Sequence, residues 1–198
     1  MLYIIVFVKD MLAGFFIGIG AIVYLTLGGI PGALLFALGL MTIVSFGFNL
    51  FTGKAGLLAT NEITPVELAK IWIGNFFGAA ICAFLIGNTP VGKDLMEFAE
   101  AIVRTRNAQS IFVNIILGIF CGVLMYVAVM GYKEFRNYLF IYIPVAVFIL
   151  NGFNHCVADM FYTCLAAEKL ADFESLIPTT IGNIIGTNLV PYMTKRGR

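Results

Sequence analysis

The feature that most constrains this chain is a series of long apolar stretches, more than a soluble domain of this size could bury. Hydrophobic residues make up 61% of the 198 residues and charged residues 12%, against about 45–50% and about 25% in a typical soluble domain. A helix of ~20 apolar residues crosses the ~30 Å hydrocarbon layer of a bilayer. The composition therefore predicts a multi-pass protein that lies in the lipid bilayer.

Six stretches have the length and polarity expected of membrane spans, and polar or glycine-rich segments separate them. They cover residues 8–28, 33–59, 66–89, 109–131, 138–165 and 177–194. The third begins with a strong helix start, because Thr64 can cap the helix and Glu67 can close a capping box. The longest polar connection, residues 88–110, contains a possible short amphipathic helix over 91–103. We predict an all-α protein that forms a single domain over residues 1–198.

The distribution of basic residues predicts how the chain is oriented, because cytoplasmic loops carry more Lys and Arg. With the N-terminus inside, the inside loops carry Lys9, Lys70, Lys133, Arg136, Lys195, Arg196 and Arg198. The outside loops then carry Lys93, Arg104, Arg106 and Lys169. This excess on one side predicts a protein of the cell (inner) membrane with both termini in the cytoplasm.

The second and fifth apolar stretches share the tripeptide Gly-Phe-Asn near their centres, at residues 47–49 and 152–154. The two stretches lie three spans apart, so two halves of three spans each would have opposite orientations. We predict an inverted 3+3 repeat of six transmembrane helices, aquaporin-like, with the second and fifth helices broken near the midplane. Where a helix is broken inside the bilayer, backbone N–H and C=O groups lose their helical partners. These groups must bond to other protein groups or line a water-filled cavity. The breaks therefore predict a pore or a binding site.

Two polar residues beside the breaks are the leading candidates for function. An ionisable group inside a span is a functional candidate by default, and the only histidine of the chain, His155, lies at the second break. Its reference pKa of ~6.5 lets it change charge near neutral pH. The alternative is a neutral histidine that only bonds a neighbouring carbonyl. Thr52 follows the first break, and its hydroxyl either faces a pore or bonds back to its own helix.

Four other polar residues have two possible roles each. Asn49 and Asn154 either brace the breaks or line the pore. Lys54 either faces a cytoplasmic vestibule or extends to the membrane surface. Asp159, one turn after the histidine, either bonds that histidine or caps amides freed by the break.

Four stretches together resemble the formate/nitrite transporter family, and the resemblance covers nearly the whole chain. "AGFFIGIGAIVYL" (13–25) is similar to the family's first helix and "GLMTIVSFGFNLFTG" (39–53) to its broken second helix. "GFNHCVADMF" (152–161) is similar to the broken fifth helix and "IGNIIGTNLV" (181–190) to the last. Members are homopentamers with one pore in each protomer. The resemblance implies a homopentamer whose substrate is a small monovalent anion, such as formate, nitrite, hydrosulfide, acetate or lactate.

The resemblance also implies roles for individual residues. Thr52 and His155 match the polar pair that faces across the centre of the pore. Leu40, Leu50 and Phe148 match the positions that form hydrophobic constrictions on either side of the pair.

Two charged positions depart from the family pattern, as does Gly122, which stands where asparagine is common. Arg106 stands where the family usually has a lysine at the start of the fourth helix. An arginine keeps the positive charge and binds a carboxylate through two nitrogens, but it does not readily release its proton. Its alternative is a surface arginine in a polar loop. Asp159 stands where asparagine is common, and it adds a possible negative charge near an anion path.

The resulting expectation is a channel or transporter for a small monovalent weak-acid anion that moves together with a proton. A bare anion at an apolar constriction costs several kcal/mol, and the neutral acid costs far less. The proton comes either from His155 or from water. An alternative function is a channel for a small neutral or cationic solute, such as ammonia/ammonium or urea, which Asp159 would suit.

Other classes of function lack support in the sequence. The sequence shows no nucleophile–base constellation of the kind that would indicate an enzyme. Its one histidine cannot supply a bis-histidine haem site. The four cysteines lack the spacing of a metal site. The net charge of +1 does not indicate nucleic-acid binding. We therefore expect no cofactor, no metal and no nucleic-acid partner.

Overall fold

The computed structural model describes residues 2–166 and 169–194, and nearly all of them lie in helices. The α-helices are α1 (Leu2–Leu27), α2 (Gly29–Phe46), α3 (Phe51–Ala55), α4 (Pro65–Gly87), α5 (Pro90–Ala108), α6 (Ile111–Phe135), α7 (Leu139–Leu150), α8 (Cys156–Ala166) and α9 (Leu176–Thr194). Two 3-10 turns, η1 (Gly56–Leu58) and η2 (Leu170–Phe173), follow α3 and α8. The part of the chain that the structure describes contains no strand, which agrees with the predicted all-α class.

Four of these helices are long and apolar enough to cross a membrane. They cover Ile4–Leu27, Gly29–Phe46, Pro65–Gly87 and Ile111–Phe135. α7 and α8 are apolar but shorter. Large apolar side chains remain exposed on the outer faces, such as Phe84 of α4 and Phe112 of α6, both 70% exposed. Such a surface is typical of a protein whose neighbours are lipid or other apolar helices.

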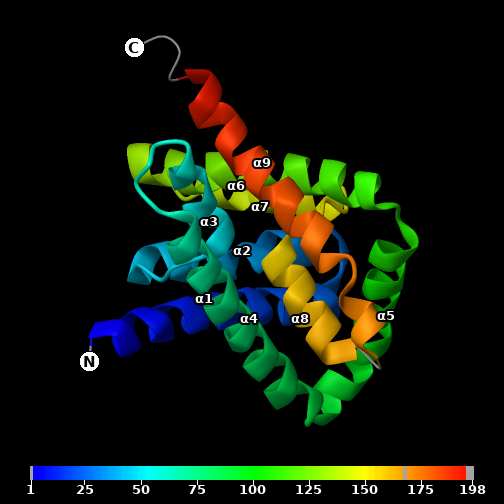
Figure 1. Ribbon diagram of the computed structural model, residues 1–198. Coiled ribbons are helices and arrows are strands. Elements are labelled where there is room, and N and C mark those ends of the chain that lie inside the picture. The colour runs from blue at the N-terminus through cyan, green and yellow to red at the C-terminus, as the bar shows by residue number, and fades with distance from the viewer. Residues whose placement is uncertain (1, 167–168, 195–198) are drawn as a thin grey trace.

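The helices form two packed groups that meet where α2 packs against α7 and around α8. α1 packs against α2 and α4, whereas α6 packs against α7 and α9. α8 packs against α4 and α5 and also contacts α1 and α9, and Figure 1 shows it near the middle of the molecule. α5 runs along one edge and connects α4 to α6. Residues from both groups therefore surround the start of α8.

Glycines allow the backbones of the two tightest helix pairs to approach closely. A Cβ added at Gly78 would overlap the carbonyl oxygen of Met11, so α4 lies directly against α1. A Cβ added at Gly186 would overlap the carbonyl oxygen of Ile119, so α9 lies directly against α6. Small residues at such contacts are the usual means by which membrane helices pack.

The structure confirms one helix boundary and changes others. The capping box at the start of α4 is present, because the Thr64 side chain accepts from the Glu67 N–H and Glu67 bonds back to Thr64. The second helix begins at Gly29 instead of residue 33, since a single residue, Gly28 at φ 61°, separates it from α1. The amphipathic helix in the polar connection is longer than 91–103, because Thr89 caps it at one end and it continues to Ala108.

Two further sequence expectations concern basic residues. Arg106 lies in the last turn of α5, so the expectation that it occupies a polar loop or the start of the fourth span is wrong. Lys195, Arg196 and Arg198, which contributed to the predicted orientation, lie outside the described residues.

We predict that Gly78→Ala destabilises the protein, because the new methyl group meets the backbone of α1, which cannot move aside as a side chain can. Overpacking of this kind costs about 1–3 kcal/mol or more. The measurement is the thermal midpoint of the detergent-solubilised protein. Gly87→Ala is the matched control, because its Cβ would lie 3.4 Å from a flexible Leu165 side chain. Equal midpoints for the two variants would contradict the close backbone contact.

Candidate functional site

Two non-helical segments interrupt the apolar stretches, and each contains a glycine in the left-handed region. Gly47, with φ 69°, follows α2, and α3 begins four residues later at Phe51. Gly152, with φ 67°, lies between α7 and α8, which begins at Cys156. Glycine adopts this conformation without a steric cost. The glycine of the shared Gly-Phe-Asn tripeptide therefore adopts the same left-handed backbone conformation in both segments.

A buried asparagine of α4 satisfies the backbone at the first segment. The side-chain oxygen of Asn75 accepts the N–H of Phe51, the first residue of α3, at 2.8 Å. Its side-chain nitrogen donates to the carbonyl of Asn49 at 2.9 Å and to the carbonyl of Asp10 at 2.7 Å. One amide thus bonds a free donor and a free acceptor of the interrupted chain and also ties them to α1.

A buried asparagine of α9 makes the corresponding contacts at the second segment. The side-chain oxygen of Asn183 accepts the N–H of Cys156, the first residue of α8, at 2.9 Å. Its side-chain nitrogen donates to the carbonyls of Asn154 at 2.8 Å and Gly118 at 2.9 Å. Asn75 and Asn183 are both fully buried, so these hydrogen bonds are made away from water.

The sequence analysis did not single out these two asparagines, although a signal for them exists. Each lies in the pattern Gly-Asn-x-x-Gly, at residues 74–78 and 182–186. The second glycine of each pattern provides the close helix contact described above, and the asparagine bonds the interrupted segment. A search for repeats in the third and sixth spans would have found the pattern.

The asparagines of the tripeptides bond to neighbouring helices. The Asn49 side chain donates to the Asp10 carboxylate at 2.7 Å. The Asn154 side chain donates to the side-chain oxygen of Asn114 at 2.6 Å. Neither asparagine lines the two cavities described below, and the contacts favour the bracing role over the pore-lining role.

The structure brings Thr52 and His155 together. The threonine hydroxyl lies 2.9 Å from Nε2 of the histidine, and the two residues are 1% and 2% exposed. The other ring nitrogen, Nδ1, accepts the N–H of Ala158 at 3.1 Å and so caps the first turn of α8. A nitrogen that accepts carries no proton, so the neutral ring has its proton on Nε2 and donates it to Thr52.

Aromatic rings pack beside the histidine. The ring of Phe148 stacks on the imidazole of His155 with centroids 5.5 Å apart and an angle of 19°. Phe36 contacts Phe148 edge-on at 5.8 Å. The imidazole is therefore held between an apolar ring and its two hydrogen bonds, an environment that favours its neutral form.

Two cavities flank the Thr52–His155 pair. The first, here called the Arg106 cavity, has a volume of about 290 Å³, and His155 and Phe148 line it together with Arg106 and Asp159. The second, the Lys54 cavity, has a volume of about 420 Å³. It is lined by residues that include Leu40, Leu50, Gly53, Lys54, Lys133 and Arg136. Basic side chains line both cavities. His155 itself lines the first cavity, and Gly53, next to Thr52 in the chain, lines the second.

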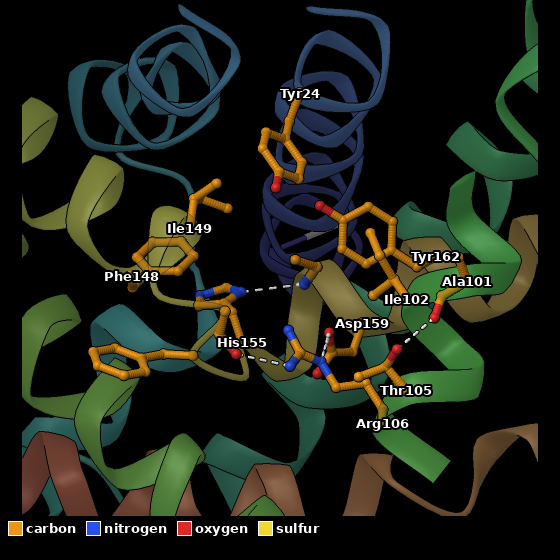
Figure 2. A pocket seen from close by; sticks show the side chains of 13 residues that line it. Tyr24, Ala101, Ile102, Thr105, Arg106, Phe148, Ile149, His155, Asp159 and Tyr162 are labelled. Carbon is orange, nitrogen blue, oxygen red and sulfur yellow. Dashed lines mark hydrogen bonds and ion pairs between the residues drawn. The ribbon is translucent and has the colours of Figure 1, made fainter. Parts of the chain in front are cut away.

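The Arg106 cavity also contains an ion pair, which Figure 2 shows. Nη1 of Arg106 donates to the carbonyl of Gly152 at 2.8 Å, and Nε lies 3.6 Å from Oδ1 of Asp159. Asp159 does not bond the side chain of His155, because both ring nitrogens of the histidine have other partners. The bond to His155, one of the two roles considered for Asp159, is therefore absent, and the acid lies beside the arginine.

Comparison with known proteins identifies the family. A family model described as formate/nitrite transporter matches residues 3–195. This chain belongs to the formate/nitrite transporter family. It is similar to the formate channel FocA of Escherichia coli (strain K12), with 26% identity over 92% of this chain and 82% of that protein. It is also similar to FocA of Haemophilus influenzae (strain ATCC 51907 / DSM 11121 / KW20 / Rd), with 30% identity over 78% of this chain and 69% of that protein.

The fold agrees with this assignment. A solved structure described as a pentameric formate channel with formate bound superposes with a TM-score of 0.82 at 24% identity, covering 96% of this chain and 95% of that chain. Membership of the family makes this chain a multi-pass membrane protein, as its composition predicts. Its relatives are named as channels and transporters, which supports a transport function over an enzymatic one.

We predict that Asn183→Ala destabilises the protein by roughly 3 kcal/mol or more. The change leaves one N–H and two carbonyls without their partner, and each unsatisfied buried group costs about 1–3 kcal/mol. The measurement is again the thermal midpoint in detergent. Asn151→Ala is the control, because Asn151, just after α7, is exposed and, among the described residues, its side chain bonds only the carbonyl of Val147 in α7. An unchanged midpoint for Asn183→Ala would refute the bracing role of this asparagine.

Proposed function

We propose that this protein is a channel or transporter for a small monovalent weak-acid anion that crosses the membrane together with a proton. The substrate class comprises formate, nitrite, hydrosulfide and short carboxylates. The observation that carries the proposal is the buried hydrogen bond between Thr52 and His155, with a cavity lined by His155 and Arg106 and a second cavity lined by Gly53, Lys54 and Lys133. The names of the relatives, which include formate channels, support the same class of substrate.

The proposed architecture is an inverted 3+3 repeat with broken second and fifth helices. The parallel contacts of Asn75 and Asn183 support it, because each bonds the N–H that starts one short helix and the carbonyl two residues before it. In this arrangement α2 with α3 and α7 with α8 form two of the six crossings. In the proposed arrangement the N-termini of the short helices α3 and α8 meet near the midplane, where the helix dipoles present positive charge to an anion.

The proposed path has two charged cavities and a neutral centre. Arg106 on one side, and Lys54 with Lys133 on the other, raise the local concentration of anions. At the centre, Leu40, Leu50 and Phe148 make the passage apolar, so a charged species would lose its hydration there. A proton that joins the anion removes this cost, and the Nε2–H of His155 then offers the neutral acid a hydrogen bond.

The proposed assembly is a homopentamer in the cell (inner) membrane with both termini in the cytoplasm. Similarity in fold to a pentameric channel and the exposed apolar faces of α4 and α6 support an assembly of copies within the bilayer. In this orientation the Lys54 cavity opens to the cytoplasm and the Arg106 cavity to the outside.

The alternative substrate class, a small neutral or cationic solute, rests on Asp159. An unpaired acid would favour ammonium over an anion. The acid instead lies beside Arg106, so the cavity carries no excess negative charge. Transport of ammonium or urea, with no transport of any weak acid, would nevertheless establish this alternative and overturn the anion proposal.

We predict that His155→Asn and Thr52→Val each reduce weak-acid uptake, because each removes the central hydrogen bond. Proteoliposomes would be tested with formate, nitrite, hydrosulfide, acetate and lactate between about pH 5 and pH 8, with ammonium and urea as comparison solutes. Uptake by the unmodified protein should rise as the pH falls. Thr42→Val is the matched control, since its hydroxyl bonds only Leu38 of its own helix. Undiminished, pH-independent transport by His155→Asn would end the role assigned to the histidine.

A further inference from the structure

The Arg106 cavity contains polar atoms that the Thr52–His155 pair does not use. Oδ2 of Asp159 and the hydroxyl of Tyr162 are buried and have no hydrogen-bond partner in the described part of the chain. The Asp159 side chain is only 4% exposed. Both residues line the cavity that His155 and Phe148 also line, so an unpartnered carboxylate oxygen lies in the cavity that leads to the central pair.

The charged groups of Arg106 and Asp159 lie close together in this cavity but are not joined by a hydrogen bond. Nε of Arg106 lies 3.6 Å from Oδ1 of Asp159, and this nitrogen is buried without a hydrogen-bond partner. An arginine usually binds a carboxylate through two short parallel hydrogen bonds. Here Nη1 donates to the Gly152 carbonyl. This bond holds the guanidinium beside Asp159, although no hydrogen bond joins the two side chains (Figure 2). A second carboxylate could therefore compete for the same cation.

Several other described side chains around Asp159 have ionisable groups, mostly thiols and phenols. They are Tyr24 of α1, Cys121 of α6, His155 just before α8, and Cys156 and Tyr162 of α8. In their ordinary range thiols and phenols ionise above about pH 8, and both ring nitrogens of His155 have hydrogen-bond partners. Of the described residues that line the cavity, Arg106 has the only guanidinium group and Asp159 the only carboxyl group.

We propose that Asp159 is the proton donor to the transported anion, and that Arg106 exchanges between the Asp159 carboxylate and the incoming anion. This inference rests on the proposed function and specifies where the proton joins the substrate. The substrates it suits are small anions with an oxygen that accepts a proton, such as formate and nitrite. Asp159 then contacts the substrate, whereas His155 only offers its hydrogen bond to the neutral acid.

The proposed step balances in protons and charge. The anion binds Arg106 while Asp159 is a carboxylic acid, and the acid proton passes from Oδ2 to an oxygen of the anion. One O–H bond breaks on Asp159 and one forms on the substrate. The substrate leaves as a neutral acid toward His155, and the new Asp159 carboxylate pairs with Arg106. A hydronium ion on the same side of the membrane restores the carboxylic acid as the next anion takes its place on Arg106, so the Arg106 cation has one anionic partner before and after each turnover.

The arrangement explains why an arginine and an acid are useful together. An arginine alone would hold the anion and could not give it a proton, because guanidinium does not readily release one. An acid alone would repel the anion when ionised. Together they bind the anion, neutralise it and release it, since the Asp159 carboxylate replaces the substrate on the cation.

The test is Asp159→Asn, which keeps the size and polarity of the side chain but cannot donate a proton at this pH. Formate uptake is measured in phosphatidylcholine/phosphatidylglycerol proteoliposomes between about pH 5 and pH 8. At the upper end of this range, we expect the half-saturating formate concentration to fall roughly tenfold, since no carboxylate competes for Arg106. We expect the maximal rate to fall roughly tenfold and to lose its rise toward low pH.

Thr105→Val is the matched control, because Thr105 lines the same cavity and, among the described residues, its hydroxyl bonds only the carbonyl of Ala101 in its own helix. It should keep the pH profile of the unmodified protein. If Asp159→Asn leaves an unpaired arginine and does not assemble, the double variant Arg106→Gln/Asp159→Asn, which buries no charge, takes its place. We expect this double variant to lose the rise toward low pH as well.

The outcomes separate this inference from the proposed function. If the unmodified protein transports no weak acid at any pH, the proposed function fails and the inference fails with it. If the unmodified protein transports formate and Asp159→Asn keeps the same half-saturating concentration and pH profile, the proposed function stands and the inference is wrong. A pH-dependent double variant would likewise refute it.

Discussion

The structure depends on how backbone polar groups are satisfied where helices stop inside an apolar environment. Each unpaired N–H or carbonyl is costly there, because no bulk water is available to bond it. Asn75 and Asn183 supply both a donor and an acceptor at the two interruptions. The glycines of the same motifs bring α4 onto α1 and α9 onto α6, so the asparagines reach the interrupted segments. The short helices α3 and α8 are thereby held in place by hydrogen bonds to neighbouring helices.

This bracing determines the chemistry of the centre. Because Asn183 bonds the N–H of Cys156, the start of α8 is fixed, and Nδ1 of His155, immediately before it, accepts the N–H of Ala158. The other ring nitrogen is then left to donate to Thr52. The histidine is thus a neutral donor in an apolar surrounding, and fixed charges lie in the cavities on either side. The proposed account assigns binding of the anion to the cavities and passage of the neutral acid to the centre.

Much of the fold could be predicted from local patterns in the sequence. Apolar length and helix-start signals located the helical segments, because both are properties of contiguous residues, and the Thr64 capping box formed as predicted. Gly-Phe-Asn lies in both non-helical segments, and it led to Thr52 and His155, which the structure places within hydrogen-bond distance of each other. The partner of Asp159 could not be predicted, because it depends on where α5 passes α8. Spacing in the sequence suggested the nearby His155 as one possible partner of Asp159. The fold instead places Arg106 beside Asp159, although the two are 53 positions apart in the chain.

The most direct test of the account is whether the anion crosses with a proton. Proteoliposomes that contain a pH-sensitive dye would receive an inward formate gradient, with the membrane voltage set by potassium and valinomycin. The account predicts that formate and protons enter in equal amounts, so that the interior acidifies and the initial rate does not change with voltage. Formate entry that carries an electric current, varies with voltage and leaves the internal pH unchanged would contradict it.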